Sequence, residues 1–175
     1  MEVLVVVKSI ASQIFWKKKK VLITGHTGFK GAWLTFWLNH LGAKITGVAL
    51  EPYTQPNLFN LLRIDSICDS HILDIRNYEQ LEEIVKTSSP EIVFHLAAQP
   101  LVRTSYDQPL ETFTTNIIGT ANILNAIRFS DSTKVGIMIT TDRSIKIMNG
   151  DGNTGRQTNW VDMIHIVAAK LRLNL

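Results

Sequence analysis

Cysteine is almost absent from this sequence, since Cys68 is the only one among 175 residues. A single cysteine excludes an intrachain disulfide and a cysteine metal cluster, and no set of His, Asp and Glu residues has the spacing of metal ligands. No apolar run approaches the ~20 residues of a membrane span. The short apolar run at 3–7 has its lysines after it, unlike a signal peptide. These absences predict a cytoplasmic protein that binds neither a membrane nor a metal.

Charge of either sign is also sparse. Lys and Arg number 18 and Asp and Glu 15, which gives a net charge of +3. Much of the excess lies in the lysine run at 17–20, which has none of the interleaved aromatic or arginine residues of a nucleic-acid surface. We interpret this run as a solvated approach to a strand and expect no nucleic-acid partner. The 45% hydrophobic and 19% charged residues are typical of a globular protein, and the length suits one domain.

A glycine pattern between a predicted strand and a predicted helix is the most informative feature present. The run at 20–24 is rich in β-branched residues, and Gly25, Gly28 and Gly31 follow it at equal spacing. In this context the first glycine allows a tight turn, the second lets the backbone approach a ligand, and the third lets helix and strand pack closely. The first helical turn then favours a pyrophosphate. The pattern predicts dinucleotide binding; the alternative is an ordinary strand-to-helix turn.

Hydrophobic periodicity predicts alternating helices and strands along the rest of the chain. A helix is expected over 29–41, with four large apolar side chains on one face: Trp33, Phe36, Trp37 and Leu41. Further strands are expected at 44–50, 70–73, 91–96 and 135–139, and further helices at 78–86 and 109–127. This alternation predicts an α/β fold with a doubly wound, mostly parallel sheet. Ligands of such sheets bind beyond the carboxyl ends of the strands.

Polar residues just after these strands are the candidates for ligand contacts. Glu51 has roughly the spacing of an acid that binds a ribose diol, although Pro52 beside it equally suits an ordinary loop. Asp74 either accepts a hydrogen bond from an adenine amine or caps the turn that follows it. His95 stands within an apolar run, so we expect a core histidine with satisfied hydrogen bonds rather than a ligand.

Four motifs together resemble the extended short-chain dehydrogenase/reductase family. They are the glycine pattern at 25–31, Asp74-Ile75-Arg76, His95-Leu-Ala-Ala-Gln99 and Thr115-Asn-x-x-Gly-Thr120. Finer matches at 24–31, 97–106 and 139–142 are similar to those of the CDP-glucose 4,6-dehydratases within that family. The resemblance covers residues 15 to about 144 and implies a Rossmann-like fold.

The resemblance implies an internal redox cycle on CDP-glucose with bound NAD. In such a cycle hydride leaves sugar C4, water is lost across C5 and C6, and hydride returns to C6. By motif, Thr141 would hydrogen-bond the sugar 4-hydroxyl and Asp142 would protonate the departing 6-hydroxyl. The alternative is that both residues only form the polar end of a strand and have no catalytic role. The residues expected to line the cofactor side, or to support it, are Gly25, Gly28, Phe29, Gly31, Asp74, Ile75, Ala97, Ala98 and Asn116.

Two further expectations concern the cofactor and the assembly. No basic residue clearly awaits a 2′-phosphate after the second predicted strand, which favours NAD over NADP. The helix at 109–127 would form the interface of a homodimer, by resemblance to the family.

The Tyr-x-x-x-Lys pair, with which the family removes a proton, is missing. The chain has no tyrosine after Thr141, and Arg143 stands where the family usually has lysine. A reading-frame slip just after Ser144 accounts for the missing pair. In the shifted frame, each new codon combines the third base of one codon with the first two bases of the next. Read in this way, the tail regains the pair, with the Tyr at the junction of codons 165 and 166 and the Lys at the junction of codons 169 and 170. Four other junctions are nearly forced by the genetic code, and all of them give the family's residues.

These features divide the chain into an N-terminal extension at 1–16, a truncated Rossmann domain at 17–144 and a tail at 145–175, which is out of frame. The Rossmann sheet is expected to be incomplete, with an apolar edge at 135–139, and a helix at 157–173 would be accidental. We therefore expect a dehydratase lineage in which this chain is inactive. The alternatives are a non-catalytic nucleotide-binding remnant and an interaction partner of an intact paralogue.

Overall fold

The computed structural model describes residues 13–139 and 168–169. Within them, one sheet has the strand order β3-β2-β1-β4-β5-β6. The strands are β1 (Lys20–Thr24), β2 (Lys44–Ala49), β3 (Asp69–Ile72), β4 (Ile92–His95), β5 (Val135–Met138) and β6 (Ala168–Ala169). The helices are α2 (Phe29–His40), α3 (Leu58–Leu61), α4 (Tyr78–Ser88), α5 (Val102–Asp107), α6 (Pro109–Phe113) and α7 (Gly119–Arg128). A 3-10 helix, η1 (Ile64–Ser66), and a π-helical segment, η2 (Thr114–Ile118), complete these elements.

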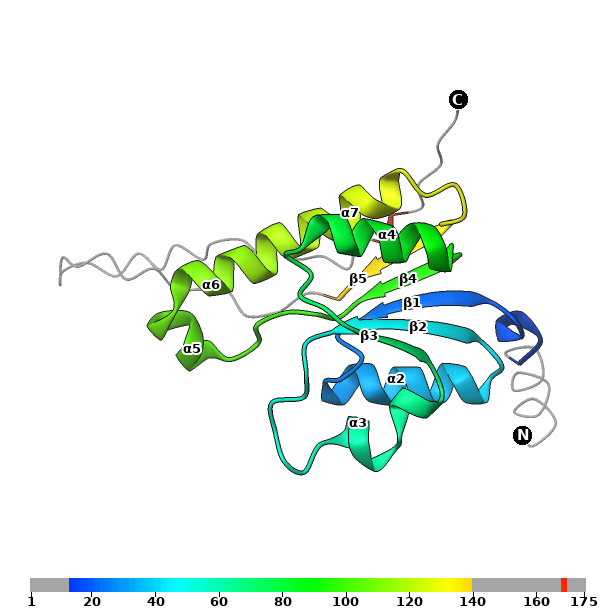
Figure 1. The fold of residues 1–175 in the computed structure, drawn as a ribbon, viewed down its shortest axis with the longest axis horizontal. Coiled ribbons are helices and arrows are strands. Elements are labelled where there is room, and N and C mark those ends of the chain that lie inside the picture. Colours follow the sequence, from blue (N-terminus) through cyan, green and yellow to red (C-terminus); the bar gives the residue numbers. More distant parts are fainter. Residues whose placement is uncertain (1–12, 140–167, 170–175) are drawn as a thin grey trace, which may run out of the picture.

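The strands from β1 to β5 pair in parallel, which confirms the predicted doubly wound, Rossmann-like α/β sheet. The chain runs from β1 outward to β2 and β3, then returns across β1 to β4 and β5. Figure 1 shows α4 and α7 on one face of the sheet and α2 and α3 on the other. The strand order therefore reverses between β1 and β4, and ligands of such sheets bind in the crevice beyond this point.

Apolar strand residues pack into separate clusters on the two faces of the sheet. Toward α4 and α7, Leu22, Val48 and Val93 pack with Leu81 and Ile123 of those helices. Toward α2, the cluster of buried residues comprises Val21, Ile23, Leu38, Leu41, Ala43, Ile45 and Ile92. Because both faces of the central strands are buried, β1 and β4 read as continuous apolar runs in the sequence.

The large aromatic side chains of α2 do not lie on the face that packs against the sheet. Trp33, Phe36 and Trp37 are 48%, 40% and 60% exposed, and only Leu41, just after the helix, is buried. The buried residues of α2 are Gly31, Ala32, Thr35 and Leu38. Small side chains on this inner face let the helix approach the sheet closely, so the rings project outward. The sequence pattern located the helix but not its buried face.

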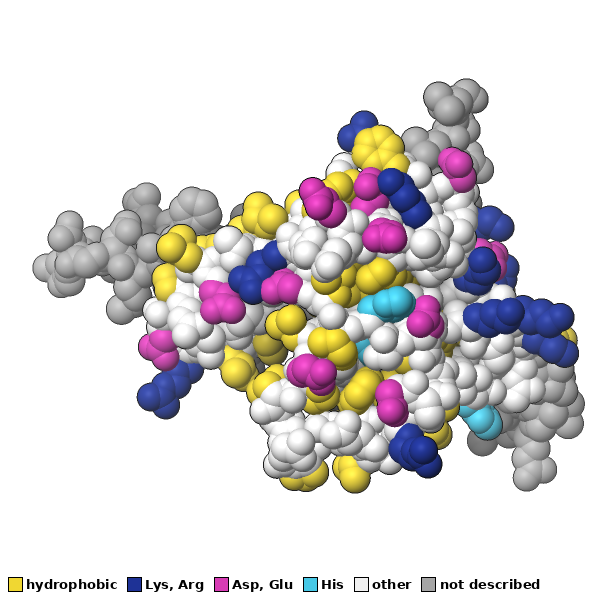
Figure 2. All heavy atoms as spheres, in the orientation of Figure 1, with side chains coloured by type: hydrophobic (Ala, Val, Ile, Leu, Met, Phe, Trp, Pro, Cys, Tyr) yellow, Lys and Arg dark blue, Asp and Glu magenta, His cyan; other side chains and the backbone are white. Residues whose placement is uncertain are grey.

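The long predicted helix at 109–127 forms as α6, η2 and α7 in direct succession. Exposed apolar side chains recur along its outer side: Leu110, Phe113, Ile117 and Leu124. Figure 2 shows hydrophobic side chains at the surface of the end of the molecule where α5 and α6 lie in Figure 1. The sequence did not predict α3, η1 or α5, which are short segments in the connections after β2 and β4.

The outer edge of β5 is paired over part of its length. β6 is antiparallel to β5 and joins Ala169 to Gly136 and Ala168 to Ile137. The expected apolar edge at 135–139 is therefore paired at these positions, and the helix expected over 157–173 is wrong at Ala168 and Ala169, which form a strand. In the ranges that the structure describes, no helix has the length and apolar character to cross a membrane.

Candidate functional site

The turn after β1 brings the glycine pattern to the carboxyl edge of the sheet. Gly25 has a φ of 78°, a left-handed conformation that favours glycine. A Cβ on Gly25 would lie 2.8 Å from the backbone nitrogen of Ala97, so no side chain fits between this turn and the end of β4. The backbone N–H of Gly25 donates to the carbonyl of Val48 at 2.8 Å, which joins the turn to β2.

Gly31 and Gly28 have contrasting surroundings. A Cβ on Gly31 would overlap the carbonyl oxygen of Gly25, so the first turn of α2 packs directly on the glycine turn. A Cβ on Gly28 would meet only that same oxygen, at 3.4 Å. Gly28 caps α2 without a side-chain hydrogen bond. The first-turn N–H groups of α2 therefore keep their capacity to bind an anion, and the helix dipole favours negative charge there.

A buried chain of hydrogen bonds lies beside this turn. The Thr24 hydroxyl lies 2.7 Å from Nδ1 of His95, and Nε2 of His95 lies 3.0 Å from the Thr120 hydroxyl. The Thr24 oxygen also accepts from the backbone N–H groups of Leu96 and Ala97, both at 3.2 Å. Burial lowers the pKa of His95 to about 4, so the ring is neutral near pH 7. His95 is thus the satisfied core histidine that the sequence predicted.

The surrounding oxygens decide which nitrogen of His95 carries the proton. The Thr24 oxygen already accepts two N–H bonds, so its hydroxyl hydrogen points to Nδ1. Nε2 therefore carries the ring proton and donates to Thr120, whose hydroxyl donates to the carbonyl of Asn116 at 2.6 Å. One arrangement of hydrogens satisfies every member of the chain. It links the ends of β1 and β4 to the helix at 109–128 and holds them in place around the crevice.

Asn116 holds the loop that follows β4. Its side-chain oxygen accepts from the backbone N–H of Gln99 at 2.8 Å, and its side-chain nitrogen donates to the Gln99 carbonyl at 3.2 Å. Asn116 lies in η2, and π-helical turns within α-helices occur frequently at functional sites. Since Ala97 and Ala98 precede Gln99 in the same loop, this two-point contact determines where their backbone lies.

Asp74 interacts with the turn that it begins. Its carboxylate accepts from the backbone N–H of Arg76 at 2.9 Å and from the Arg76 guanidinium at 2.5 Å. These hydrogen bonds hold the pKa of Asp74 below its usual range, so the group is ionised near pH 7. Of the two roles that the sequence left open for Asp74, the structure shows the capping of the turn. The two carboxylate oxygens together make four hydrogen-bond contacts with Arg76, which is about the acceptor capacity of a carboxylate, so a ligand would have to displace one of these contacts.

Ile75 and Phe29 differ sharply in exposure. Ile75 is buried, and its side chain occupies the space where a Cβ on Gly119 of α7 would lie. Its carbonyl accepts from the Asn122 side chain at 3.0 Å. Phe29, the first residue of α2, is 71% exposed. Ile75 therefore supports the packing of α7 on this edge, whereas the Phe29 ring is accessible beside the glycine turn.

His26 is a residue whose role sequence reasoning missed. It is fully buried within the glycine turn, where its ring packs against Gly47 of β2 and Phe59 of α3, and its Nε2 lies 2.7 Å from the Ser70 hydroxyl. Burial lowers the pKa of His26 to about 4, so this ring is also neutral near pH 7. The contacts anchor the turn to β2 and β3. Gly47 is the one signal in the sequence, because a glycine inside a strand marks a close approach.

The structure brings the described members of the predicted cofactor site to one edge of the sheet. The glycine turn follows β1, Asp74 and Ile75 follow β3, and Ala97 and Ala98 follow β4, while Asn116 lies against the last of these loops. The predicted catalytic residues, Thr141 and Asp142, lie outside the described residues, as does Arg143. In the part of the chain that is described, no cluster of His, Cys, Asp and Glu could hold a metal ion.

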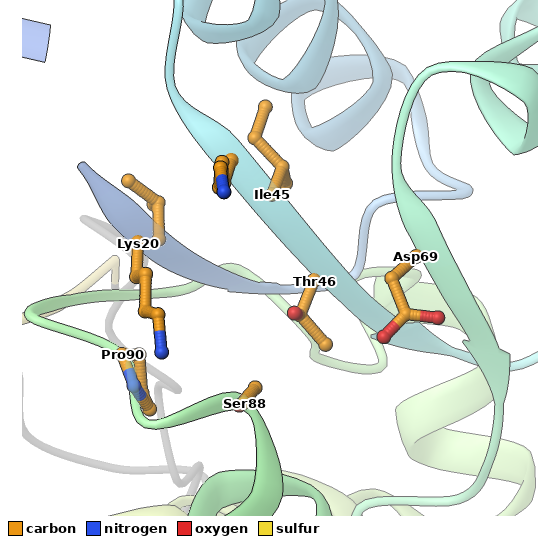
Figure 3. Close-up of a pocket in the computed structure, with 8 residues that line it drawn as sticks. Lys20, Ile45, Thr46, Asp69, Ser88 and Pro90 are labelled. Carbon is orange, nitrogen blue, oxygen red and sulfur yellow. The ribbon is translucent and has the colours of Figure 1, made fainter. Parts of the chain in front are cut away.

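A hollow of about 200 Å³ lies at the opposite edge of the sheet, at the amino ends of the strands. Its lining includes Lys20, Ile45, Thr46, Asp69, Ser88 and Pro90. In Figure 3 the Lys20 side chain extends toward Pro90, and Asp69 stands apart from it across the hollow. The side chains do not converge on one point, and ligands of doubly wound sheets bind at the other edge. This hollow is therefore not part of the candidate site.

A parallel sheet of this order, with this glycine turn after its first strand, is the architecture of the extended short-chain dehydrogenase/reductases. A family model described as GDP-mannose 4,6 dehydratase matches residues 22–143, and the chain belongs to that family. It is 48% identical to the CDP-glucose 4,6-dehydratase of Salmonella typhimurium over 129 residues, which cover 74% of this chain and 36% of that enzyme. It is 32% identical to the GDP-mannose 4,6-dehydratase of Vibrio cholerae over 127 residues, which cover 67% of this chain and 33% of that enzyme. The chain thus spans about a third of the length of these relatives.

Solved structures of nucleotide-sugar epimerases share the fold. The UDP-glucose 4-epimerase of Thermotoga maritima, solved with UDP-glucose, aligns with a TM-score of 0.59 and 30% identity over 67% of this chain and 36% of that chain. The UDP-glucose-4-epimerase of Stenotrophomonas maltophila, solved with bound NAD, aligns with a TM-score of 0.60 over 69% of this chain and 36% of that chain. At 23% identity, the second likeness concerns the fold alone.

Proposed function

We propose that this chain carries the dinucleotide-binding half of an NAD-dependent nucleotide-sugar 4,6-dehydratase of the CDP-glucose type. The observation that carries the proposal is the glycine turn, in which Gly25 and Gly31 leave no room for a side chain while Gly28 presents open backbone at the start of α2. This arrangement suits a diphosphate lying on the first-turn N–H groups. The family membership and the 48% identity to the CDP-glucose enzyme support the choice of reaction.

The residues at this edge fit NAD. The first-turn N–H groups of α2 would hold the diphosphate, and Asp74 would accept from the adenine amine in place of a hydrogen bond from the Arg76 guanidinium. Glu51 is exposed after β2, at the spacing of a ribose-binding acid. No lysine or arginine occurs between residues 50 and 62, so this loop has no partner for a 2′-phosphate, which favours NAD over NADP. When bound, NAD supplies the acceptor for the sugar hydride.

The proposed chemical groups follow β5. Thr141 would hydrogen-bond the sugar 4-hydroxyl, and Asp142 would give its proton to the departing 6-hydroxyl, so that this oxygen leaves as water. β5 runs parallel to β4, so its carboxyl end at Met138 lies on the same edge as the glycine turn. The family match includes both residues, which supports these roles.

We further propose that residues 145–175 are translated out of frame, so that the chain as given binds a nucleotide without turning it over. The family model matches up to residue 143, next to the Ser144 at which the slip was inferred. The given sequence lacks a Tyr-x-x-x-Lys pair after Thr141, so the pair with which the family takes the proton from the 4-hydroxyl is missing from it. The coding DNA across Ser144 tests this directly, because codons that cannot be re-read in the shifted frame would refute the slip.

An interaction role is a second proposal, favoured by the outer side of the helix at 109–128. Leu110, Phe113, Ile117 and Leu124 are exposed at successive spacings of three, four and seven residues, which is the pattern of a helix seam. We propose that this seam pairs with the same helix of a second copy, or of an intact paralogue. The mass of the purified chain by light scattering, compared between wild type and Ile117→Glu, tests the pairing.

Calorimetric titration of the full chain with NAD, and separately with NADP, tests the cofactor proposal. We expect NAD to bind more tightly than NADP, and Gly28→Ala to weaken NAD binding by about tenfold because its methyl group stands where the diphosphate approaches. Gly42→Ala is the matched control at the far end of α2. Its φ of 89° predicts a loss of stability of ~1 kcal/mol with NAD affinity unchanged.

Two results test the proposed binding of NAD and the proposed absence of turnover. A folded wild-type chain that binds no NAD would contradict dinucleotide binding. The same preparation is incubated with CDP-glucose and NAD, and the amount of 4-keto sugar is measured over time. Formation of this product would contradict the proposed absence of turnover.

A further inference from the structure

Thr27, inside the glycine turn, makes a contact that the proposed function does not use. Its hydroxyl donates to the backbone carbonyl of Leu50 at 2.8 Å. Leu50 directly follows β2, and its side chain is 57% exposed, so burial does not fix its position. Among the described residues, the bond from Thr27 is the only hydrogen bond that residues 50–53 make. The turn that is proposed to bind the diphosphate therefore also holds the chain just after β2.

The other hydrogen bonds that hold this part of β2 stop short of Leu50. On the side of the glycine turn, the N–H of Gly25 donates to the carbonyl of Val48, which lies within the strand. On the opposite side, the N–H of Leu73 donates to the carbonyl of Ala49 at 2.8 Å. Ala49 is the last residue of β2. The Thr27 hydroxyl thus extends the attachment of β2 by one residue, beyond the end of the strand.

This extra attachment bears on Glu51, the next residue along the chain. The Leu50 carbonyl and the Glu51 N–H belong to one planar peptide unit, so a hydrogen bond to this carbonyl fixes the plane from which Glu51 starts. Pro52 follows and keeps the backbone of Glu51 away from the helical region. The backbone of Glu51 is therefore constrained on both sides. Its side chain is exposed and, among the described residues, has no hydrogen-bond or ion-pair partner, so the carboxylate is available to a ligand.

We propose that Thr27 is a positioning residue for the adenosine ribose of NAD, and that it acts through the peptide between Leu50 and Glu51. The inference rests on the proposed function, because it requires that NAD lies on the glycine turn. A carboxylate held in place before binding loses less freedom when it accepts hydrogen bonds from the ribose diol. Thr27 has a single hydroxyl hydrogen, and the Leu50 carbonyl takes it. The turn thus serves the diphosphate through its backbone and the ribose through this side chain.

A purely structural role for Thr27 would have a different signature. If the hydroxyl only stabilised the turn, its loss would lower the fraction of chains able to bind, and every ligand of the turn would be affected alike. The ratio of two affinities cancels such an effect when the two ligands differ only in the ribose diol. The proposed role predicts a change in this ratio, because the diol is the group that Glu51 contacts.

Calorimetric titration of the full chain with NAD, and with an NAD analogue whose adenosine ribose lacks the 2′- and 3′-hydroxyls, tests the inference. We expect the wild-type chain to bind NAD about thirtyfold more tightly than the analogue, because hydrogen bonds to a carboxylate are charge-assisted. Thr27→Val should lower this ratio to about threefold by weakening NAD binding. Thr27→Ala lacks the same hydroxyl and should give the same low ratio, whereas Thr27→Ser retains the hydroxyl and should keep the wild-type ratio.

Thr87→Val is the matched control, since the Thr87 hydroxyl of α4 also donates to a backbone carbonyl, that of Glu83 at 2.9 Å. α4 ends at Ser88, which lines the hollow at the amino ends of the strands, so Thr87 lies away from the glycine turn. This variant should keep the wild-type ratio. Glu51→Gln should lower the ratio by itself, and Thr27→Val added to it should have little further effect, because both changes act on one contact.

Four results would overturn the inference while NAD binding stands. Thr27→Val may keep the wild-type ratio or weaken both ligands equally, Thr27→Ser may lose the ratio although it retains the hydroxyl, or the wild-type chain may bind both ligands equally well. Each of these would show that the hydroxyl does not act on the ribose through Glu51. A folded wild-type chain that binds neither ligand would instead contradict the proposed function, and this inference with it.

Discussion

The two buried histidines make the stability of this chain sensitive to mild acid. Burial lowers the pKa of His26 and of His95 from 6.5 to about 4. Between these values the unfolded state binds protons that the folded state does not bind, so stability rises with pH across this window and falls on acidification. The stability that neutral His26 and His95 contribute is fully present above about pH 6.5 and is lost progressively as the pH falls toward 4.

The magnitude follows from the size of the two shifts. Each shift costs ~2 kcal/mol of unfolding free energy when the pH is lowered from 7.5 to 5, and ~3 kcal/mol below pH 4. For the two histidines together the loss at pH 5 is ~4 kcal/mol, a large part of the 5–15 kcal/mol typical of a domain. Hydrogen bonds from Arg76 and Lys19 lower the pKa values of Asp74 and Glu91 from their usual 3.8 and 4.5, so the stability that these carboxylates contribute is lost only at the acid end of the pH range, after most of the histidine effect.

Urea unfolding of the full chain at several pH values between 7.5 and 5 measures this dependence. His26→Gln and His95→Gln each remove one titrating ring, so each should remove about half of the loss on acidification, whatever its effect at pH 7.5. Nitrogen chemical shifts of the two rings report the protonation directly. The reasoning is refuted if either single variant keeps the full wild-type dependence, or if both rings become protonated near pH 6.5 in the folded chain.

Three further variants probe the local geometry of the site. Gly31→Ala should destabilise the chain by ~3 kcal/mol, because the added methyl group would overlap the Gly25 carbonyl. Urea unfolding measures this loss. A stability equal to wild type would show that the turn does not pack on α2 as described. Thr24→Val keeps the shape of the side chain but leaves the Ala97 N–H and His95 Nδ1 without their partner, while the Leu96 N–H keeps its bond to the Thr24 carbonyl. We therefore expect a loss of ~2–4 kcal/mol in the same assay, and a neutral effect would disprove the inferred hydrogen-bond chain. Asn116→Ala should cost ~1–3 kcal/mol and accelerate hydrogen exchange at the Gln99 amide, and unchanged exchange there would contradict the two-point contact.

Local sequence signals were sufficient for much of the site. The glycine spacing between a β-branched run and a helical pattern predicted the turn, and the structure supplies the steric reason at Gly25 and Gly31. The apolar surroundings of His95 predicted a buried ring, and its partners Thr24 and Thr120 are now known. These predictions succeeded because each depends on a few neighbouring residues and on the rule that ligands bind at the carboxyl ends of parallel strands.

Other features depend on which elements meet in space. The ring of His26 is buried because β2, β3 and α3 surround the glycine turn, and only Gly47 hinted at this. The short helices α3 and α5 have too few residues for a periodic pattern to be recognised. Asp74 was left with two roles, and the position of the Arg76 side chain showed that it caps its own turn.

The sequence by itself determined the order of the elements, the parallel sheet and the glycine turn, because periodicity and glycine spacing are local properties of the chain. Only the tertiary structure decided which face of α2 is buried. An apolar stripe at helical spacing looks the same whether it packs inward or remains at the surface. Gly31 and Ala32 are buried where α2 packs on the sheet and the glycine turn, whereas Trp37 of the same helix stays exposed.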